Sequence, residues 1–127
     1  MEHVVLDASA LIALIYAEKG ANIVEKHLSH SIISTVNLAE VASYLAMQGM
    51  DNKMVASLLD DLALEIVSFN QEHAFLTTDL RPKTKSKGLS LGDRACLALA
   101  ISEKLPVLTA DTAWAKLDLK VKIQLIR

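Results

Sequence analysis

The sequence has 127 residues and lacks the features of several common protein classes. Its single cysteine, Cys96, excludes a disulfide within the chain and is typical of a reducing compartment. Apolar neighbours predict that Cys96 is a buried structural thiol, because no pattern around it indicates an activated nucleophile. The four histidines are scattered, and His27 and His30 lack a third ligand, so no histidine-based metal site is expected.

Long hydrophobic runs are missing as well. The longest extends over residues 8–17, includes Ser9, and is too short to span a bilayer. The opening residues Met1, Glu2 and His3 do not form the basic region of a secretory signal. We therefore expect a soluble, cytoplasmic protein with no membrane segment.

Neither sign of charge dominates, because 13 Lys and Arg stand against 15 Asp and Glu. Any binding of nucleic acid must therefore be local. Aromatic residues make up only 4%, which excludes a broad base-stacking platform and favours packing for Trp114. Hydrophobic residues reach 52%, enough for the core of one domain covering residues 1–127.

Short apolar runs alternate with amphipathic segments along the whole chain. We expect strands at residues 4–6, 31–34, 65–69, 106–109 and 121–126. We expect helices at 8–16, 21–28, 35–48, 51–61, 71–80 and 91–104, and a helical turn at 112–116. The basic segment 81–88, with Pro82 and Gly88, is predicted to be a loop. This order predicts an α/β fold, a three-layer α/β/α sandwich with a mainly parallel central sheet.

The helix expected at 91–104 carries the most unusual pattern. Ser90 and Asp93 have the spacing of a capping box. Gly92 in the first turn lowers helix stability, which predicts the close approach of a neighbouring group. A carboxylate at the start of an apolar helix is unfavourable unless it is paired or binds a metal. Asp93 is therefore expected to have partners elsewhere in the chain.

Three further acidic residues have similar positions. Asp7 and Asp111 follow expected strands, and Glu40 lies in the first turn of an expected helix, with Asn37 at capping-box spacing before it. In such folds the binding crevice lies at the carboxyl ends of the strands, where all four acids are expected to converge. For any one of these acids alone, helix capping is the better explanation. Together they would repel one another unless a cation such as Mg²⁺ or Mn²⁺, which prefers oxygen ligands, neutralised them.

Four segments carry a resemblance to a known family. Residues 4–11 (VVLDASAL), 37–41 (NLAEV), 89–95 (LSLGDRA) and 108–114 (LTADTAW) resemble, in order and spacing, the signature segments of PIN-domain ribonucleases. They are most similar to the VapC toxins of bacterial and archaeal toxin–antitoxin pairs. The resemblance covers essentially the whole chain. It implies a single PIN-like domain, a Mg²⁺- or Mn²⁺-dependent endoribonuclease, a VapB-type antitoxin partner and a homodimer.

The resemblance also assigns roles to residues. Asp7, Glu40, Asp93 and Asp111 match the family's acidic quartet, and Ser9 matches its small hydroxyl residue. We expect Asp7 and Asp93 to bind the metal directly and Glu40 to orient or deprotonate a water molecule. Asp111 is expected to complete the metal shell or hold a second ion. Ser9 and Thr112 are expected either to donate hydrogen bonds to these carboxylates or to cap their helical turns.

A cluster of basic residues gives further support to the prediction that the protein binds RNA. Arg81, Lys83, Lys85 and Lys87 crowd one segment, and Arg94 follows Asp93. As a set they are expected to hold RNA phosphates. Each alone is more typical of a solvated loop, and Arg94 of a surface ion pair with Asp93.

Two other α/β families fit less well. A haloacid-dehalogenase-like phosphatase needs a second Asp two residues after Asp7, where this chain has Ser9. A receiver-type signalling domain needs an Asp at the end of the third strand, and residues 65–69 contain none. A solitary PIN-domain nuclease in RNA processing and a catalytically idle PIN-like binding module remain open alternatives.

Overall fold

The computed structural model describes residues 2–127, so Met1 lies outside it. Its strands are β1 (Val4–Leu6), β2 (Ser31–Ser34), β3 (Glu65–Val67), β4 (Val107–Thr109) and β5 (Ile123–Leu125). They form one five-stranded sheet in the order β3-β2-β1-β4-β5, with every neighbouring pair parallel. The central strand β1 thus places the residue that follows it, Asp7, at the middle of the sheet's carboxyl edge.

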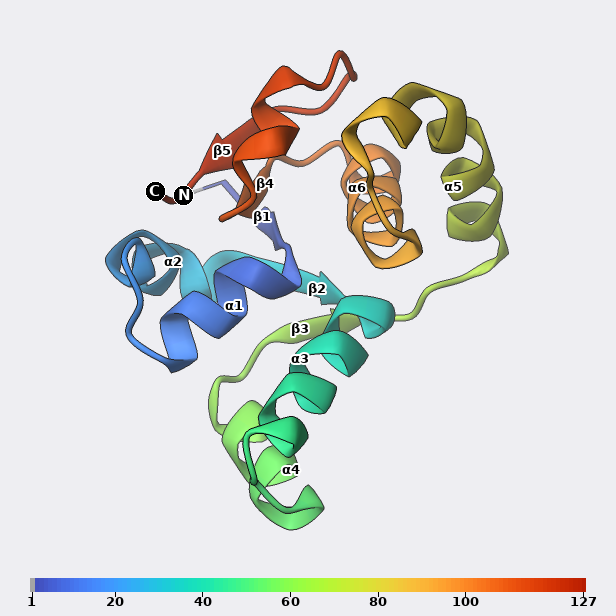
Figure 1. Cartoon of the computed structure of the whole chain (residues 1–127). Helices are drawn as coiled ribbons and strands as arrows, with labels where there is room; N and C mark the ends of the chain where they lie inside the picture. The colour runs from blue at the N-terminus through green and yellow to red at the C-terminus, as the bar shows by residue number, and fades with distance from the viewer. Residues whose placement is uncertain (1) are drawn as a thin grey trace.

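Six α-helices connect the strands: α1 (Ala8–Ile15), α2 (Ala21–His27), α3 (Thr35–Met47), α4 (Asn52–Asp61), α5 (Gln71–Thr84) and α6 (Leu91–Glu103). Short 3₁₀ turns follow three elements: η1 (Leu28–His30), η2 (Lys85–Lys87) and η3 (Thr112–Lys116). In Figure 1, α5 and α6 lie together to the right of β1 and β4, and α1 and α2 lie on the other side. The predicted three-layer α/β/α sandwich is therefore confirmed, and the sheet is parallel throughout.

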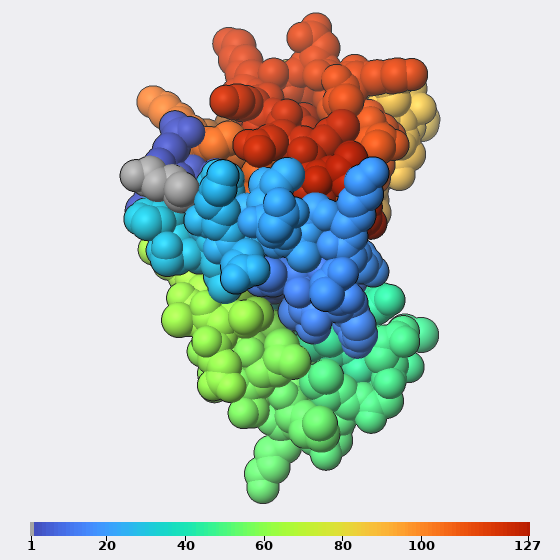
Figure 2. Space-filling model, turned by 90° about the vertical axis from the view of Figure 1, so that its left-hand side faces the viewer, coloured from blue at the N-terminus to red at the C-terminus, as the bar shows by residue number. Residues whose placement is uncertain are grey.

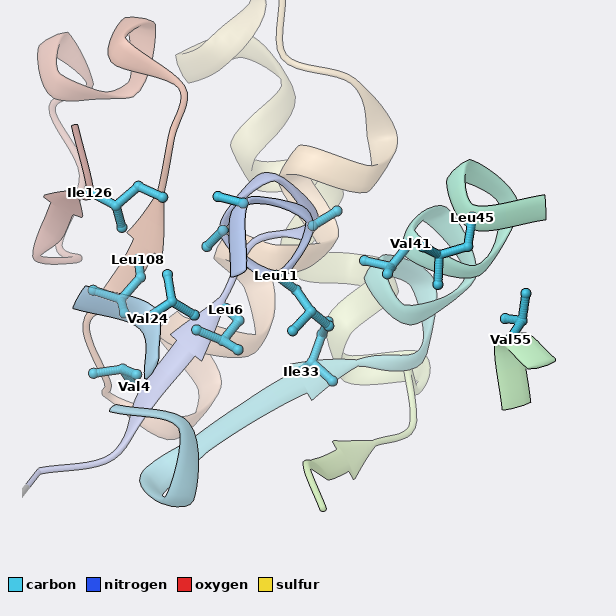
Figure 3. Close-up of a cluster of buried hydrophobic side chains, with 13 residues drawn as sticks. Val4, Leu6, Leu11, Val24, Ile33, Val41, Leu45, Val55, Leu108 and Ile126 are labelled. Carbon is cyan, nitrogen blue, oxygen red and sulfur yellow. The ribbon is translucent and has the colours of Figure 1, made fainter. Parts of the chain in front are cut away.

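Alternation along β1 explains the two separate cores. Val4 and Leu6 pack with α1 to α4, whereas Val5 packs with α5 and α6. Figure 3 shows the first of these cores, in which Leu6, Leu11 and Ile33 point toward one another. The second core contains Cys96 and Trp114, both with no exposed area, as predicted for a structural thiol and a packing indole.

The prediction of a loop at residues 81–88 is wrong. Helix α5 continues through Pro82 to Thr84, and η2 follows before Gly88 turns the chain with a φ of +68°. Buried Thr84 donates a hydrogen bond from its hydroxyl to the Leu80 carbonyl at 2.9 Å. Leu80 packs with α6 in the second core and Thr84 is fully buried, and this burial outweighs the N–H group that Pro82 lacks. The segment is thus a helical end with exposed cations.

The ends of the molecule are formed by different parts of the chain. Figure 2 shows the green segments around α3 and α4 at one end, the red C-terminal segment at the other, and α2 between them. Three expected strands are shorter than predicted, at Glu65–Val67, Val107–Thr109 and Ile123–Leu125. Within residues 2–127, no helix is long and apolar enough to cross a membrane.

Candidate active site

Asp7 is the centre of the candidate site. It is buried at the carboxyl end of β1, where its N–H donates to the Leu108 carbonyl of β4 at 3.0 Å. One carboxylate oxygen, Oδ2, accepts hydrogen bonds from the Ser9 hydroxyl at 2.6 Å and the Thr109 hydroxyl at 2.9 Å. The side chain makes no capping bond to α1, so the alternative of a helix cap is wrong for Asp7. Its orientation is fixed by two hydroxyl groups.

Thr109 was missed by the sequence reasoning. It is the fully buried last residue of β4, and β4 pairs with β1 so that Leu108 lies opposite Leu6. Thr112, the residue expected to help the carboxylates, is exposed in η3 and makes no such hydrogen bond among the described residues. A hydroxyl residue at the end of an apolar strand, one position before Ala110-Asp111, was the available signal.

Glu40 reaches the site from α3 and touches α6. Its Oε1 accepts a 2.8 Å hydrogen bond from the amide of Asn37, which also donates to the Gly92 carbonyl at 2.9 Å. A Cβ atom at Gly92 would lie 2.6 Å from Cδ of Glu40, so only glycine leaves room for this carboxylate. The close approach predicted at Gly92 is therefore confirmed. Asn37 is not the cap of α3, because Ser34 accepts from the Val36 N–H in that role.

Asp93 caps helix α6 with one carboxylate oxygen and, within residues 2–127, leaves the other oxygen free to bind a ligand. Its Oδ2 accepts from the Ser90 N–H at 2.9 Å, and its own N–H donates to the Ser90 hydroxyl at 3.2 Å. The predicted capping box is therefore confirmed. The half-buried side chain keeps its other oxygen, Oδ1, without a hydrogen bond among the residues described. Capping and ligand binding are thus compatible at Asp93.

Asp111 lies at the margin of this group. It is exposed, and its carboxylate accepts from the Ala113 N–H at 3.0 Å at the start of η3. Its N–H donates to the Thr109 hydroxyl at 3.1 Å, and Thr109 in turn contacts Asp7. The structure therefore brings Asp7, Glu40 and Asp93 into electrostatic contact and joins Asp111 to them through a backbone bond.

The pKa shifts reflect this convergence. Burial raises the pKa of Asp7 from 3.8 to about 6, against the hydrogen bonds from Ser9 and Thr109, and the charges of Asp93 and Glu40 add to the rise. Burial is also the main cause that raises the pKa of Glu40. The hydrogen bond from Asn37 opposes this rise, and the charge of Asp93 adds to it. The three acids repel one another in the folded protein.

The side chains of residues 2–127 contain no group of three or more His, Cys, Asp or Glu already placed to hold a metal ion. The donor set nevertheless fits a hard divalent cation, because every side chain offered is a carboxylate. Asp7 and Asp93 each have an oxygen free of hydrogen bonds within the described part of the chain.

The basic residues divide into two groups. Arg81, Lys83, Lys85 and Lys87 are exposed at the end of α5 and in η2. Arg94 is only 9% exposed, and its guanidinium donates to the Thr77 carbonyl of α5 at 3.0 Å. The expected surface ion pair with Asp93 and the expected RNA contact are therefore wrong for Arg94. Among the described residues, the one salt bridge joins Arg127 and Glu18.

Solved structures with the same fold include chains from VapBC complexes and a toxin. The chain is 18% identical to one in DNA-bound VapBC from Salmonella typhimurium, with a TM-score of 0.76 and all of both chains covered. It is 22% identical to one in VapBC2 from Rickettsia felis bound to a promoter fragment, with a TM-score of 0.72 and 96% and 97% covered. VapC20 from Mycobacterium tuberculosis, a sarcin-ricin loop cleaving toxin, is 15% identical, with a TM-score of 0.68 and 94% and 98% covered.

At these identities the structures establish a shared fold. A comparison with curated proteins gives no match. The family model described as the PIN domain matches residues 4–120, a range that includes all four acids and the hydroxyl residues around Asp7. The chain therefore belongs to the PIN domain family.

Proposed function

We propose that this protein is a divalent-metal-dependent endoribonuclease that hydrolyses RNA phosphodiester bonds. The observation that carries the proposal is the convergence of Asp7, Glu40 and Asp93 from the end of β1, from α3 and from α6. Burial raises the pKa of Asp7 and Glu40, the repulsion between the negative charges of these acids raises it further, and a bound cation would neutralise those charges. Perturbed carboxylates gathered at the carboxyl edge of a parallel sheet are typical of a catalytic site. The PIN family match supports the same chemistry.

In this proposal Asp7 and Asp93 hold the metal through their free oxygens. Bound Mg²⁺ or Mn²⁺ supplies acidification of water and neutralises charge on the phosphate. Ser9 and Thr109 fix the orientation of Asp7 through its other oxygen. Glu40 would orient a water molecule and accept its proton, and the burial that raises the pKa of its carboxylate makes it a stronger base. Asp111 completes the site from the η3 side.

The proposal extends to a biological role. We place the chain, as a single domain of residues 1–127, among the VapC-type toxins restrained by a VapB-type antitoxin and acting as a homodimer in the cytoplasm. Its support is the likeness, over nearly the full length, to chains from VapBC complexes of two organisms. A third relative, VapC20, is itself described as a toxin that cleaves the sarcin-ricin loop.

Cleavage of RNA should require Mg²⁺ or Mn²⁺ and stop in EDTA, because the converging acids need a cation to approach a phosphate. A labelled RNA incubated with the purified protein and each metal measures this. Asp51→Asn, which changes an exposed helix cap on α4 outside the site, should cleave RNA with the same metal dependence as the wild type. Undiminished cleavage in excess chelator would refute the metal-dependent reaction, and no cleavage in any metal would favour an idle binding module.

Replacing Lys83, Lys85 and Lys87 with Ala should weaken RNA binding and make it less sensitive to salt. Each lost contact to a single-stranded phosphate lowers the slope of log K against log salt by about 0.7. The slope is measured by fluorescence anisotropy in EDTA. The control replaces three exposed lysines elsewhere, Lys19, Lys26 and Lys53. Equal slopes for the two triple variants would show that the segment 83–87 does not bind RNA.

A further inference from the structure

Asn37 is a buried polar residue in the first turn of α3, with no exposed area. Both of its hydrogen-bond partners, Oε1 of Glu40 at 2.8 Å and the Gly92 carbonyl at 2.9 Å, can only accept when Glu40 is ionised. The amide therefore presents its NH₂ end to them, and its two N–H groups are both used. Through this group α3 is joined to α6, 55 residues further along the chain.

The other end of the same amide is unfavourable. Oδ1 of Asn37 is buried and has no hydrogen-bond partner among the described residues. An unpaired buried acceptor destabilises the folded state, whereas an apolar side chain at this position would not. Helix capping does not account for the amide either, because Ser34 caps α3. What the side chain contributes lies in its two donor bonds.

Those bonds act on a flexible group. Glu40 has a long side chain with several rotatable bonds, and ordering its carboxylate loses rotamer entropy. The carboxylate lies against the α-carbon of Gly92, where a Cβ would come within 2.6 Å of Cδ. Glu40 is an exposed residue, so the Asn37 amide on one side and the first turn of α6 on the other are what hold its carboxylate next to Gly92.

We propose that Asn37 is a positioning residue for the active site, which holds the Glu40 carboxylate against the first turn of α6 beside Asp93. The proposal rests on the proposed function, because the position of the Glu40 carboxylate affects the reaction only if Glu40 orients the attacking water molecule. Groups that orient a functional carboxylate typically change metal affinity or activity by about 10- to 100-fold when they are removed. Asn37 acts through Glu40, and its second bond, to the Gly92 carbonyl, holds the turn of α6 against which that carboxylate lies.

The first test is the Asn37→Ala variant. We expect kcat for RNA cleavage to fall about 10- to 100-fold and KM to change by less than about threefold, because RNA binding does not use the amide. Asn37→Asp, which keeps the shape and loses both donors when ionised, should behave in the same way. Leu45→Ala is the control, a buried truncation on the same helix about two turns beyond Asn37. It should lower the melting temperature and keep kcat.

A double-mutant cycle gives the decisive result. Mn²⁺ affinity is measured by electron paramagnetic resonance for wild type, Asn37→Ala, Glu40→Gln and the double variant. The negative charge of Glu40 acts on Asp7, a proposed metal ligand, and so favours a bound cation. If Asn37 acts through Glu40, its removal weakens Mn²⁺ binding in the wild type and has no further effect beside Glu40→Gln, which lacks that charge. Equal effects in both backgrounds, or a wild type that binds no Mn²⁺, would overturn the proposal.

One outcome separates this proposal from the function on which it rests. A wild type that binds Mn²⁺ and leaves RNA intact refutes the nuclease, and the cycle still decides the role of Asn37. If neither Asn37 variant folds, the side-chain amide resonances of Asn37 in the wild type are followed by NMR during Mg²⁺ titration. A shift of these resonances supports the proposal, and resonances that stay unchanged overturn it.

Discussion

Asp7→Asn is expected to abolish RNA cleavage and, in the same variant, the stabilisation that Mg²⁺ gives to the folded protein. The amide has the shape of the carboxylate, and its oxygen can still accept from Ser9 and Thr109. What is lost is the negative charge at the buried centre of the site. We expect the rate to fall at least about 10²- to 10³-fold, as when one preorganised electrostatic group is removed.

The same variant should be more stable than the wild type when no metal is present. Asp7 has a pKa of about 6 in the folded protein against 3.8 for an ordinary aspartate. Between these two pH values the folded state therefore holds a proton that the unfolded chain has released. Stability therefore falls as pH rises from about 4 to about 6, by up to roughly 3 kcal/mol for a pKa difference of about two. Replacing the acid with an amide, which does not titrate, removes this loss. The difference in stability should therefore be largest at neutral pH and vanish below about pH 4.

Thermal unfolding at pH 4 and pH 7, with and without Mg²⁺, measures both effects beside the cleavage assay. Asp93→Asn should give the same loss of activity and of metal stabilisation, because the two acids are proposed to share one ion. Its capping box survives, since the amide oxygen still accepts from the Ser90 N–H. Variants that keep the metal shift and the activity of the wild type would refute the ligand assignment.

The sequence predicted the order of the elements because its periodicities are strong and local. Apolar runs such as Val4–Leu6 and Val107–Thr109 are buried on both faces, and the helices between them are amphipathic. Parallel strands bring their carboxyl ends to one edge, which is why Asp7, Glu40 and Asp93 could be expected near one another. The close approach of Glu40 to Gly92 could be predicted because a glycine inside a helix is otherwise unfavourable.

The errors arose where a residue's environment depends on a distant segment. Thr109, rather than Thr112, contacts Asp7 because β4 lies next to β1, and local sequence does not specify strand order. Arg94 is buried because α6 packs against α5, where its guanidinium donates to the Thr77 carbonyl. The end of α5 was predicted to be a loop because Pro82 and the charged residues around it are typical of loops. The burial of Thr84, which extends the helix, cannot be seen in the local sequence. In each case a tertiary contact overrides a local preference.

Gly92→Ala should separate activity from stability more sharply than any other single change. Within a helix, alanine is more favourable than glycine by about 1 kcal/mol. The new methyl group, however, would overlap the carboxylate of Glu40, whose Cδ lies 2.6 Å from the position of that Cβ. Because the carboxylate is the end of a flexible side chain, it moves and the backbone stays. We expect a melting temperature near that of the wild type and a rate about 10²-fold lower, as for a displacement of about 1 Å.

Shortening the displaced side chain tests this cause. Glu40→Asp removes one methylene and so makes room for the methyl group, and in that background Gly92→Ala should change the rate much less than in the wild type. Leu91→Ala is the matched control, because Leu91 precedes Gly92 in the first turn of α6 and its side chain is 56% exposed. It should retain wild-type cleavage. An equal loss from Gly92→Ala in both backgrounds would show that the methyl group acts on α6 itself, and that the contact between Gly92 and Glu40 does not set the rate.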